Sequence, residues 1–159
     1  MNKEKGNQEF KLKDFAALAE QVKASRQRKK VVVAAAEDLH TLEGINQAYR
    51  KGMITPILVG NKEKIIKIME EAGFDFGPVE IVPTEGDQEA ARQAVALIGQ
   101  GKGDVLMKGR LQTADLLKEV VSKEHGLACG GIMSHVGLFE LPGYPKLMVI
   151  TDGGMLPYP

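Results

Sequence analysis

The sequence has little of several features that mark specialised classes of protein. One cysteine among 159 residues rules out a disulfide within the chain and favours a reducing, cytoplasmic location. The 21 basic residues equal the 21 acidic residues, a balance that argues for neither nucleic acid nor a membrane surface as partner. No apolar run approaches the roughly 20 residues of a membrane span, and the charged start of the chain lacks the apolar core of a signal peptide. What remains is the composition of an ordinary globular protein, 43% hydrophobic and 26% charged.

Short apolar runs alternate with helical periodicities along most of the chain. Residues 1–9 are expected to be disordered, and a helix is predicted from Phe10 to about Lys23. The predicted strands are 31–36, 54–59, 79–82, 104–107 and 146–151, with a helix after each of the first four and an irregular loop over 134–145. This alternation predicts a single α/β domain over residues 1–159, built on a parallel sheet with helices on both faces.

The segment from Gly103 to Lys118 organises the rest of the chain. A predicted strand ends in a loop formed by Lys108, Gly109 and Arg110, and a helix with Thr113 as its expected N-cap follows. The free N–H groups and the positive dipole end of a helix attract anions, and the loop adds two cations. A phosphate-bearing small molecule is therefore the expected ligand. The alternative is a plain strand-to-helix junction with solvated cations, and Asp115 in the first turn favours that alternative.

The predicted topology gathers several polar segments at one edge of the sheet. In a parallel sheet the carboxyl ends of all strands lie along one edge, and ligands bind there. Lys108–Arg110 and the segment from Thr151 to Gly154 both follow predicted strands, so both are expected at that edge. Glu37–Asp38 and Ser134–His135 are expected to join them. Asp152 is equally suited to binding a ligand and to capping a turn.

Other polar groups carry weaker signals. His40, His125 and His135 lack the spacing of metal ligands, so no metal site is predicted. The basic cluster over residues 23–30 is interpreted as the favourable end of a helix dipole rather than a nucleic-acid patch. Cys129 is expected to be a small apolar filler rather than a nucleophile. Ser134 and His135 point to opposite sides of an extended chain, which favours substrate lining by one of them over a catalytic dyad.

Several blocks of the sequence resemble the phosphate acetyl/butyryltransferase family. They are LMKGRLQTADLLK at 106–118, SHVGLFELPGYPKL at 134–147 and ITDGGM at 150–155. Two upstream blocks, VVVAAAEDLHTLEGINQAYRKG and ITPILVGN, look like the N-terminal region of that family. The similarity runs from about Val31 to the end of the chain, and the butyryl-transferring branch is the nearest match.

The resemblance implies the transfer of an acyl group between coenzyme A and inorganic phosphate, with coenzyme A as a co-substrate and no metal or bound cofactor. It also implies a two-domain α/β fold related to the isocitrate and isopropylmalate dehydrogenases, an active site between the domains, and a homodimer. This chain corresponds to an N-terminal portion of that architecture. The implied substrate-binding residues are Lys108, Gly109, Thr113 and Asp115, with Arg110 as the second loop cation, and Ser134, His135, Thr151, Asp152 and Gly153 on the same wall.

The chain is shorter than the members of that family, whose catalytic machinery continues further along. We therefore expect these 159 residues alone to have little acyltransferase activity and to self-associate through apolar surface near residues 146–151. Two alternatives stay open: a dehydrogenase-like relative on the same fold, and a non-catalytic module that binds coenzyme A or phosphate. The sequence does not indicate the catalytic residues or a preference among acetyl, butyryl and branched acyl groups.

Overall fold

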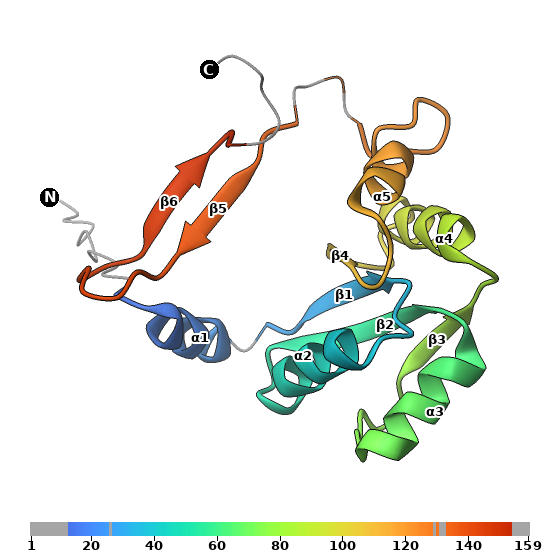
Figure 1. Cartoon of the computed structure of the whole chain (residues 1–159), viewed down its shortest axis with the longest axis horizontal. Coiled ribbons are helices and arrows are strands. Elements are labelled where there is room, and N and C mark those ends of the chain that lie inside the picture. Colours follow the sequence, from blue (N-terminus) through green and yellow to red (C-terminus); the bar gives the residue numbers. More distant parts are fainter. Residues whose placement is uncertain (1–12, 26, 129, 131–132, 154–159) are drawn as a thin grey trace, which may run out of the picture. The chain divides into compact units, whose positions relative to one another are not determined.

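The computed structural model describes residues 13–25, 27–128, 130 and 133–153, and the chain divides into two compact units. One unit spans Arg26–Gly131, and its described part holds a four-stranded sheet and the helices that cover it (Figure 1). The other unit joins the segment up to Ser25 with the segment from Ile132 onward. Its described part consists of a helix and a two-stranded ribbon.

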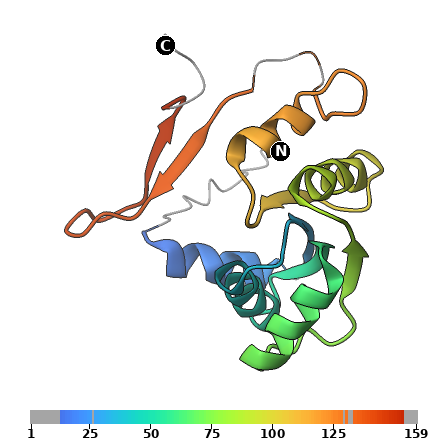
Figure 2. The ribbon, with the colours of Figure 1, turned by 45° about the vertical axis from the view of Figure 1, so that its right-hand side comes forward.

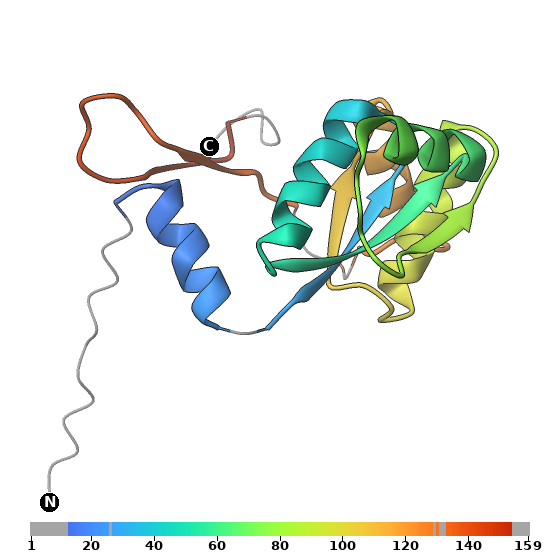
Figure 3. The same cartoon turned by 90° about the horizontal axis from the view of Figure 1, so that it is seen from below.

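The larger unit is built on a parallel sheet. Its strands are β1 (Lys29–Ala34), β2 (Ile54–Gly60), β3 (Glu80–Pro83) and β4 (Val105–Lys108), in the order β3-β2-β1-β4. All three pairings are parallel, and the strand arrows point the same way in Figure 3. The inner residues of β1 and β2 are buried, as expected for strands covered on both faces. The predicted parallel sheet is confirmed, with small shifts in the bounds of its strands.

Helices cover both faces of this sheet, as predicted. The helices are α2 (Leu39–Arg50), α3 (Lys62–Ala72), α4 (Asp87–Gly99) and α5 (Thr113–Val120). Alternate residues of β1 point to opposite faces. Val31 and Val33 belong to a buried cluster with residues of α2 and α3, whereas Val32 and Ala34 belong to a cluster with residues of α4 and α5.

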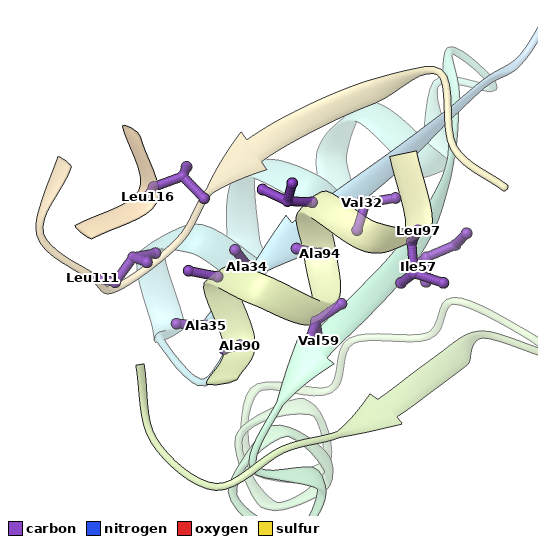
Figure 4. Close-up of a cluster of buried hydrophobic side chains, with 12 residues drawn as sticks. Val32, Ala34, Ala35, Ile57, Val59, Ala90, Ala94, Leu97, Leu111 and Leu116 are labelled. Atoms are coloured by element: carbon purple, nitrogen blue, oxygen red, sulfur yellow. The ribbon is translucent and has the colours of Figure 1, made fainter. Parts of the chain in front are cut away.

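The cluster on the α4 side is packed through small side chains. Ala90, Ala91 and Ala94 of α4 are all at most 1% exposed, and they let the helix lie directly on the valines of β1 and β2 (Figure 4). Leu111 and Leu116 extend the same cluster to the loop after β4 and to α5. The loop after β4 is therefore anchored in the core by an apolar side chain.

Local polar groups set the starts of two helices in this unit. The Asp38 carboxylate accepts hydrogen bonds from the N–H of Thr41 at 2.9 Å and from its hydroxyl at 2.8 Å. The Asn61 side chain accepts from the N–H of Lys64 at 3.0 Å. Both residues are N-caps, because each satisfies an N–H that has no partner inside the helix.

The smaller unit contains α1 (Phe15–Ala24), β5 (Val136–Phe139) and β6 (Met148–Thr151) among its described residues. The two strands form an antiparallel ribbon, drawn in orange and red in Figure 2. The N–H of Phe15 donates to the Glu140 carboxylate at 2.9 Å, which links the helix to the ribbon. The predicted helix over residues 10–23 is confirmed from Phe15, and residues 10–12 lie outside the described residues.

The ribbon corrects two expectations. The segment 134–145 was expected as a loop but contains β5, and the strand near residues 146–151 pairs antiparallel with β5 rather than joining the parallel sheet. A strand needs a partner for its backbone groups, and here the nearest apolar stretch along the chain supplies it. The expected disorder of residues 1–9 and the role of Cys129 concern residues outside the described part of the chain.

Candidate functional site

The order of the strands defines a binding edge in the larger unit. From β1 the chain moves outward to β2 and β3, and then crosses to the other side of β1 to form β4. In open α/β sheets, ligands bind outside the carboxyl ends of the strands where the order reverses in this way. Here that point lies between the ends of β1 and β4. Ala35–Asp38 follow β1, and Gly109–Gln112 follow β4.

Gly109 lets the loop after β4 lie against the end of β1. The N–H of Gly109 donates to the Ala34 carbonyl and the N–H of Arg110 to the Ala35 carbonyl, both at 2.8 Å. A Cβ on residue 109 would lie 2.7 Å from the Ala34 oxygen and would overlap the Ala35 oxygen. The backbone therefore requires glycine at this position, and the parallel pairing continues past the end of the strand.

The two loop cations have different surroundings. The Lys108 ammonium donates to the carbonyl oxygens of Gly109 at 3.1 Å and Leu111 at 2.9 Å. The Arg110 side chain is exposed and forms no hydrogen bond or ion pair with the part of the chain that the structure describes. Arg110 is thus free to contact an anionic ligand, whereas most of the donor capacity of Lys108 is already used.

The acidic group at this edge is Asp38. The N–H of Thr41 and then the Thr41 hydroxyl lower the pKa of Asp38 from its ordinary value of 3.8, and the charges of His40 and Arg110 lower it further. The N–H of Arg110 donates to the carbonyl of Ala35, three residues before Asp38, so Arg110 lies near the start of α2. The structure thus brings Asp38 and Arg110 to the same edge of the sheet, as the sequence predicts.

The start of α5 differs from the prediction. Thr113 is the first residue of the helix, and the N-cap is Gln112, whose side chain makes no capping hydrogen bond. Asp115 lies exposed in the first turn. Because no side chain caps this end, its N–H groups are held in place mainly by the preceding loop.

The remaining predicted residues lie at the open end of the ribbon. The N–H of Asp152 donates to the His135 carbonyl at 2.6 Å, and the N–H of His135 donates to the Asp152 carboxylate at 3.4 Å. The structure thus brings Ser134 and His135 together with Thr151, Asp152 and Gly153. These two bonds join Asp152 to His135 across the end of the ribbon, and a role of Asp152 in binding a ligand stays a prediction. The topological reason for expecting these residues beside Lys108 does not hold, because β6 is not part of the parallel sheet. Their place on the same wall stays a prediction from the resemblance.

Sequence reasoning placed Glu37 at this edge but did not predict the burial of its carboxylate, and it missed two further polar features. Glu37 Oε2 is buried against Gly60 and has no hydrogen-bond partner among the described residues. His125 Nε2 lies 2.6 Å from the buried Glu119 carboxylate, and its Nδ1 lies 3.3 Å from Ser122 Oγ. The alternation of residues in the sequence carried no signal for either contact.

A hollow of about 630 Å³ beside β2 and β3 is lined by Asn61, Lys62, Glu63, Pro83, Thr84, Glu85 and Glu89, an acidic set unsuited to phosphate.

Metal and membrane features are absent from the described residues. No three His, Cys, Asp or Glu side chains among them come together as a metal-binding group. None of the helices found there is both long enough and apolar enough to cross a bilayer.

Known proteins resemble the chain over most of its length. A family model described as phosphate acetyl/butaryl transferase matches residues 15–93. A phosphate butyryltransferase of Clostridium acetobutylicum is 39% identical over 148 residues, 93% of this chain and 49% of that protein. A phosphate acetyltransferase of Thermotoga maritima is 38% identical over 128 residues, 80% of this chain and 43% of that protein. The crystal structure of a branched-chain phosphotransacylase from Enterococcus faecalis superposes with a TM-score of 0.61 and 26% identity, covering 80% of this chain and 44% of that one.

A parallel sheet with helices on both faces and a cationic loop where the strand order reverses defines an α/β ligand-binding architecture. The chain belongs to the phosphate acetyl/butyryltransferase family, as the sequence blocks indicate. It spans about half the length of the curated relatives that it matches.

Proposed function

We propose that this chain forms the phosphate-binding part of an acyltransferase that exchanges an acyl group between coenzyme A and inorganic phosphate. One observation carries the proposal: a chain with this similarity to phosphate butyryltransferase places Arg110, which forms no hydrogen bond or ion pair with the described residues, on a fixed loop where the strand order reverses. Anions bind at such places because N–H groups and cations converge there.

The reaction places clear demands on such a site. An oxygen of phosphate attacks the carbonyl carbon of the thioester, and the bond between that carbon and sulfur breaks. The sulfur leaves as the thiolate of coenzyme A, which then takes up a proton, and the acyl group stays on phosphate. Phosphate is a poor nucleophile unless it is held in position, so a fixed cation beside it contributes directly to the rate. Arg110 has the charge and the exposure for this role.

We assign substrate binding to two groups of residues. The first lies in the larger unit and comprises Gly109, Arg110, Thr113 and Asp115, together with Lys108, whose ammonium is bonded to the loop itself. The second lies at the open end of the ribbon and comprises Ser134, His135, Thr151, Asp152 and Gly153. Support for the first group comes from its place in the sheet, and support for the second comes from the resemblance of its sequence blocks to the family.

Further parts of the proposal rest on the family alone. They are a homodimer as the working unit, a cytoplasmic location, and coenzyme A as a co-substrate with no bound cofactor. Both acetyl and butyryl transfer are consistent with the relatives, because one similar protein is a phosphate butyryltransferase and another is a phosphate acetyltransferase.

A chimera tests the proposed activity. The matched half of the Clostridium acetobutylicum phosphate butyryltransferase is replaced by this chain, and release of coenzyme A from butyryl-CoA and acetyl-CoA is measured with phosphate present. We expect little turnover from the chain alone and turnover from the chimera. Arg110→Gln in the chimera should lower kcat/KM for phosphate about tenfold, the loss expected for one charged contact. Lys51→Gln, at an exposed cation at the end of α2, is the matched control and should change kcat/KM little.

A folded chimera without turnover would contradict the proposal. If that chimera still binds phosphate, the result supports the alternative, a non-catalytic module that binds phosphate or coenzyme A.

A further inference from the structure

Lys108 lies on the side of β4 that faces α4 and α5. Residues two apart on a strand share a face, and Leu106 packs against the cluster formed with α4 and α5. The Lys108 side chain therefore starts on the face under α5. Its ammonium then folds back over the loop that follows the strand.

The contacts of the ammonium are with main-chain oxygens of that loop. It donates to Gly109 at 3.1 Å and to Leu111 at 2.9 Å, so two of its three N–H groups are engaged. The Gly109 carbonyl also accepts from the N–H of Leu111 at 3.1 Å, which closes a tight turn. The Leu111 side chain is 5% exposed and anchors the turn in the core. The turn is thus held by apolar packing on one side and by a cation on the other.

This turn sets the position of the two groups that are suited to bind an anion, namely the first N–H groups of α5 and the guanidinium of Arg110. Gln112 makes no side-chain capping bond, so the first N–H groups of α5 depend on the turn for their direction. The backbone of Arg110 lies within the turn and donates to Ala35 at 2.8 Å. A shift of the turn would move the helix start and the guanidinium together.

We propose that Lys108 is a positioning residue: its ammonium holds the turn from Gly109 to Gln112, and thereby the start of α5 and the Arg110 side chain, where the anionic substrate binds. The identity of that substrate, inorganic phosphate or an acyl phosphate, rests on the proposed function. In this arrangement Arg110 contacts the substrate and Lys108 acts through the loop.

Backbone amide hydrogen exchange on the 159-residue chain tests the first half of the proposal. Lys108→Met keeps the length of the side chain and removes its donors. We expect the amides of Gly109 and Arg110 to exchange about tenfold faster, relative to the amide of Leu58 in the centre of the sheet, because local opening of the turn becomes easier. Lys108→Arg retains donors for both carbonyls and should restore much of the protection. Arg110→Gln should leave exchange unchanged.

A titration with inorganic phosphate, followed by the amide chemical shifts against equal ionic strength of sodium chloride, tests the second half. We expect Arg110→Gln to weaken phosphate binding about tenfold. Lys108→Met should weaken it less, and Lys108→Arg should bind as the native chain does. If Lys108→Met does not fold, Lys108→Gln takes its place, because its amide N–H groups can still donate to a carbonyl oxygen of the turn while its charge is removed. Lys108→Gln should keep most of the loop protection and of the phosphate affinity, whereas a direct ligand would lose phosphate affinity with the loop still protected.

Two outcomes overturn the proposal. In the first, Lys108→Met leaves exchange at Gly109 and Arg110 unchanged. In the second, it weakens phosphate binding as much as Arg110→Gln does with the turn still protected. A native chain that shows no phosphate-dependent shifts, while Lys108→Met still accelerates exchange, counts against the proposed function and supports the hold of Lys108 on the turn.

Discussion

The ends of β4 and β6 offer a direct comparison. Both strands are short apolar runs that end in a polar residue, and a glycine follows within two positions, Gly109 in one case and Gly153 in the other. β4 lies beside the buried β1, and its loop is fixed by backbone bonds on one side and a buried leucine on the other. β6 pairs only with β5 among the described residues, and Val149 on it is 59% exposed. The same local pattern thus gives a rigid site in one place and an exposed turn in the other, because the neighbouring strand differs.

The largest expected difference in stability is between truncating an apolar side chain of the parallel sheet and truncating one of the ribbon. Leu58 in β2 is fully buried, so Leu58→Ala should lower the free energy of unfolding by about 3 kcal/mol through lost burial and a cavity. Val149→Ala on the ribbon should change it by less than about 0.5 kcal/mol. Urea unfolding followed by circular dichroism measures both. A large loss of unfolding free energy for Val149→Ala would show that Val149 is buried in solution. The sheet and the ribbon would then not differ in this respect.

The two glycines should differ next. A Cβ at Gly109 would collide with backbone oxygens, which cannot move aside cheaply, so Gly109→Ala should cost about 2 kcal/mol. No described residue lies within 4 Å of a Cβ at Gly153, so Gly153→Ala should cost less than about 0.5 kcal/mol. Urea unfolding of the two variants side by side gives the comparison, and equal costs would mean that the loop after β4 can relax.

The two aspartates should differ by a smaller amount. Asp38→Ala removes an N-cap and should cost about 1 kcal/mol at pH 7, whereas Asp38→Asn should keep most of the cap. The pKa of Asp38 is lowered in the folded chain, so its contribution is full above the ordinary value of 3.8 and is lost as the pH falls through the lowered value. The gap between the native chain and Asp38→Ala should therefore shrink below about pH 4. Asp152→Ala should show a smaller cost at pH 7, since its bond to His135 is long and exposed.

The smallest effects are expected at two residues with left-handed backbone angles, Ala35 with φ of 54° and Asp152 with φ of 59°. Glycine relieves this conformation at both positions but makes the unfolded chain more flexible. Asp152→Gly should change stability by less than about 0.5 kcal/mol, because the side chain is only half-buried and its hydrogen bond to His135 is long. Ala35→Gly also removes a buried methyl group and should cost slightly more, about 0.5 kcal/mol. Thermal unfolding of both variants resolves the order, and a gain in stability for Ala35→Gly would contradict it.

The parallel sheet could be predicted because its strands and helices obey local periodicity, and the position of Lys108–Arg110 followed from topology. The antiparallel ribbon could not, because residues 136–139 lie close to Pro142, Gly143 and Pro145 and no short turn marks the hairpin. The contacts of the Lys108 ammonium could not be predicted from the sequence either. A lysine in a loop is usually solvated, and only the fold shows which carbonyl oxygens lie within its reach. The place of this loop at the edge of the sheet was therefore predictable, but the contacts of its two cations were not.

The close packing of the alanines of α4 limits which substitutions this sequence can accept. Ala90, Ala91 and Ala94 touch the sheet with no room beside them, so a larger side chain at any one of them would push the helix off β1 and β2. Natural variants should accept glycine or serine there more readily than leucine. A larger residue becomes tolerable only when Val32, Ile57 or Val59 opposite shrinks at the same time. Substitutions on the buried face of α4 should therefore occur together with substitutions in the two strands beneath it. The exposed positions of the same helix can be substituted one at a time.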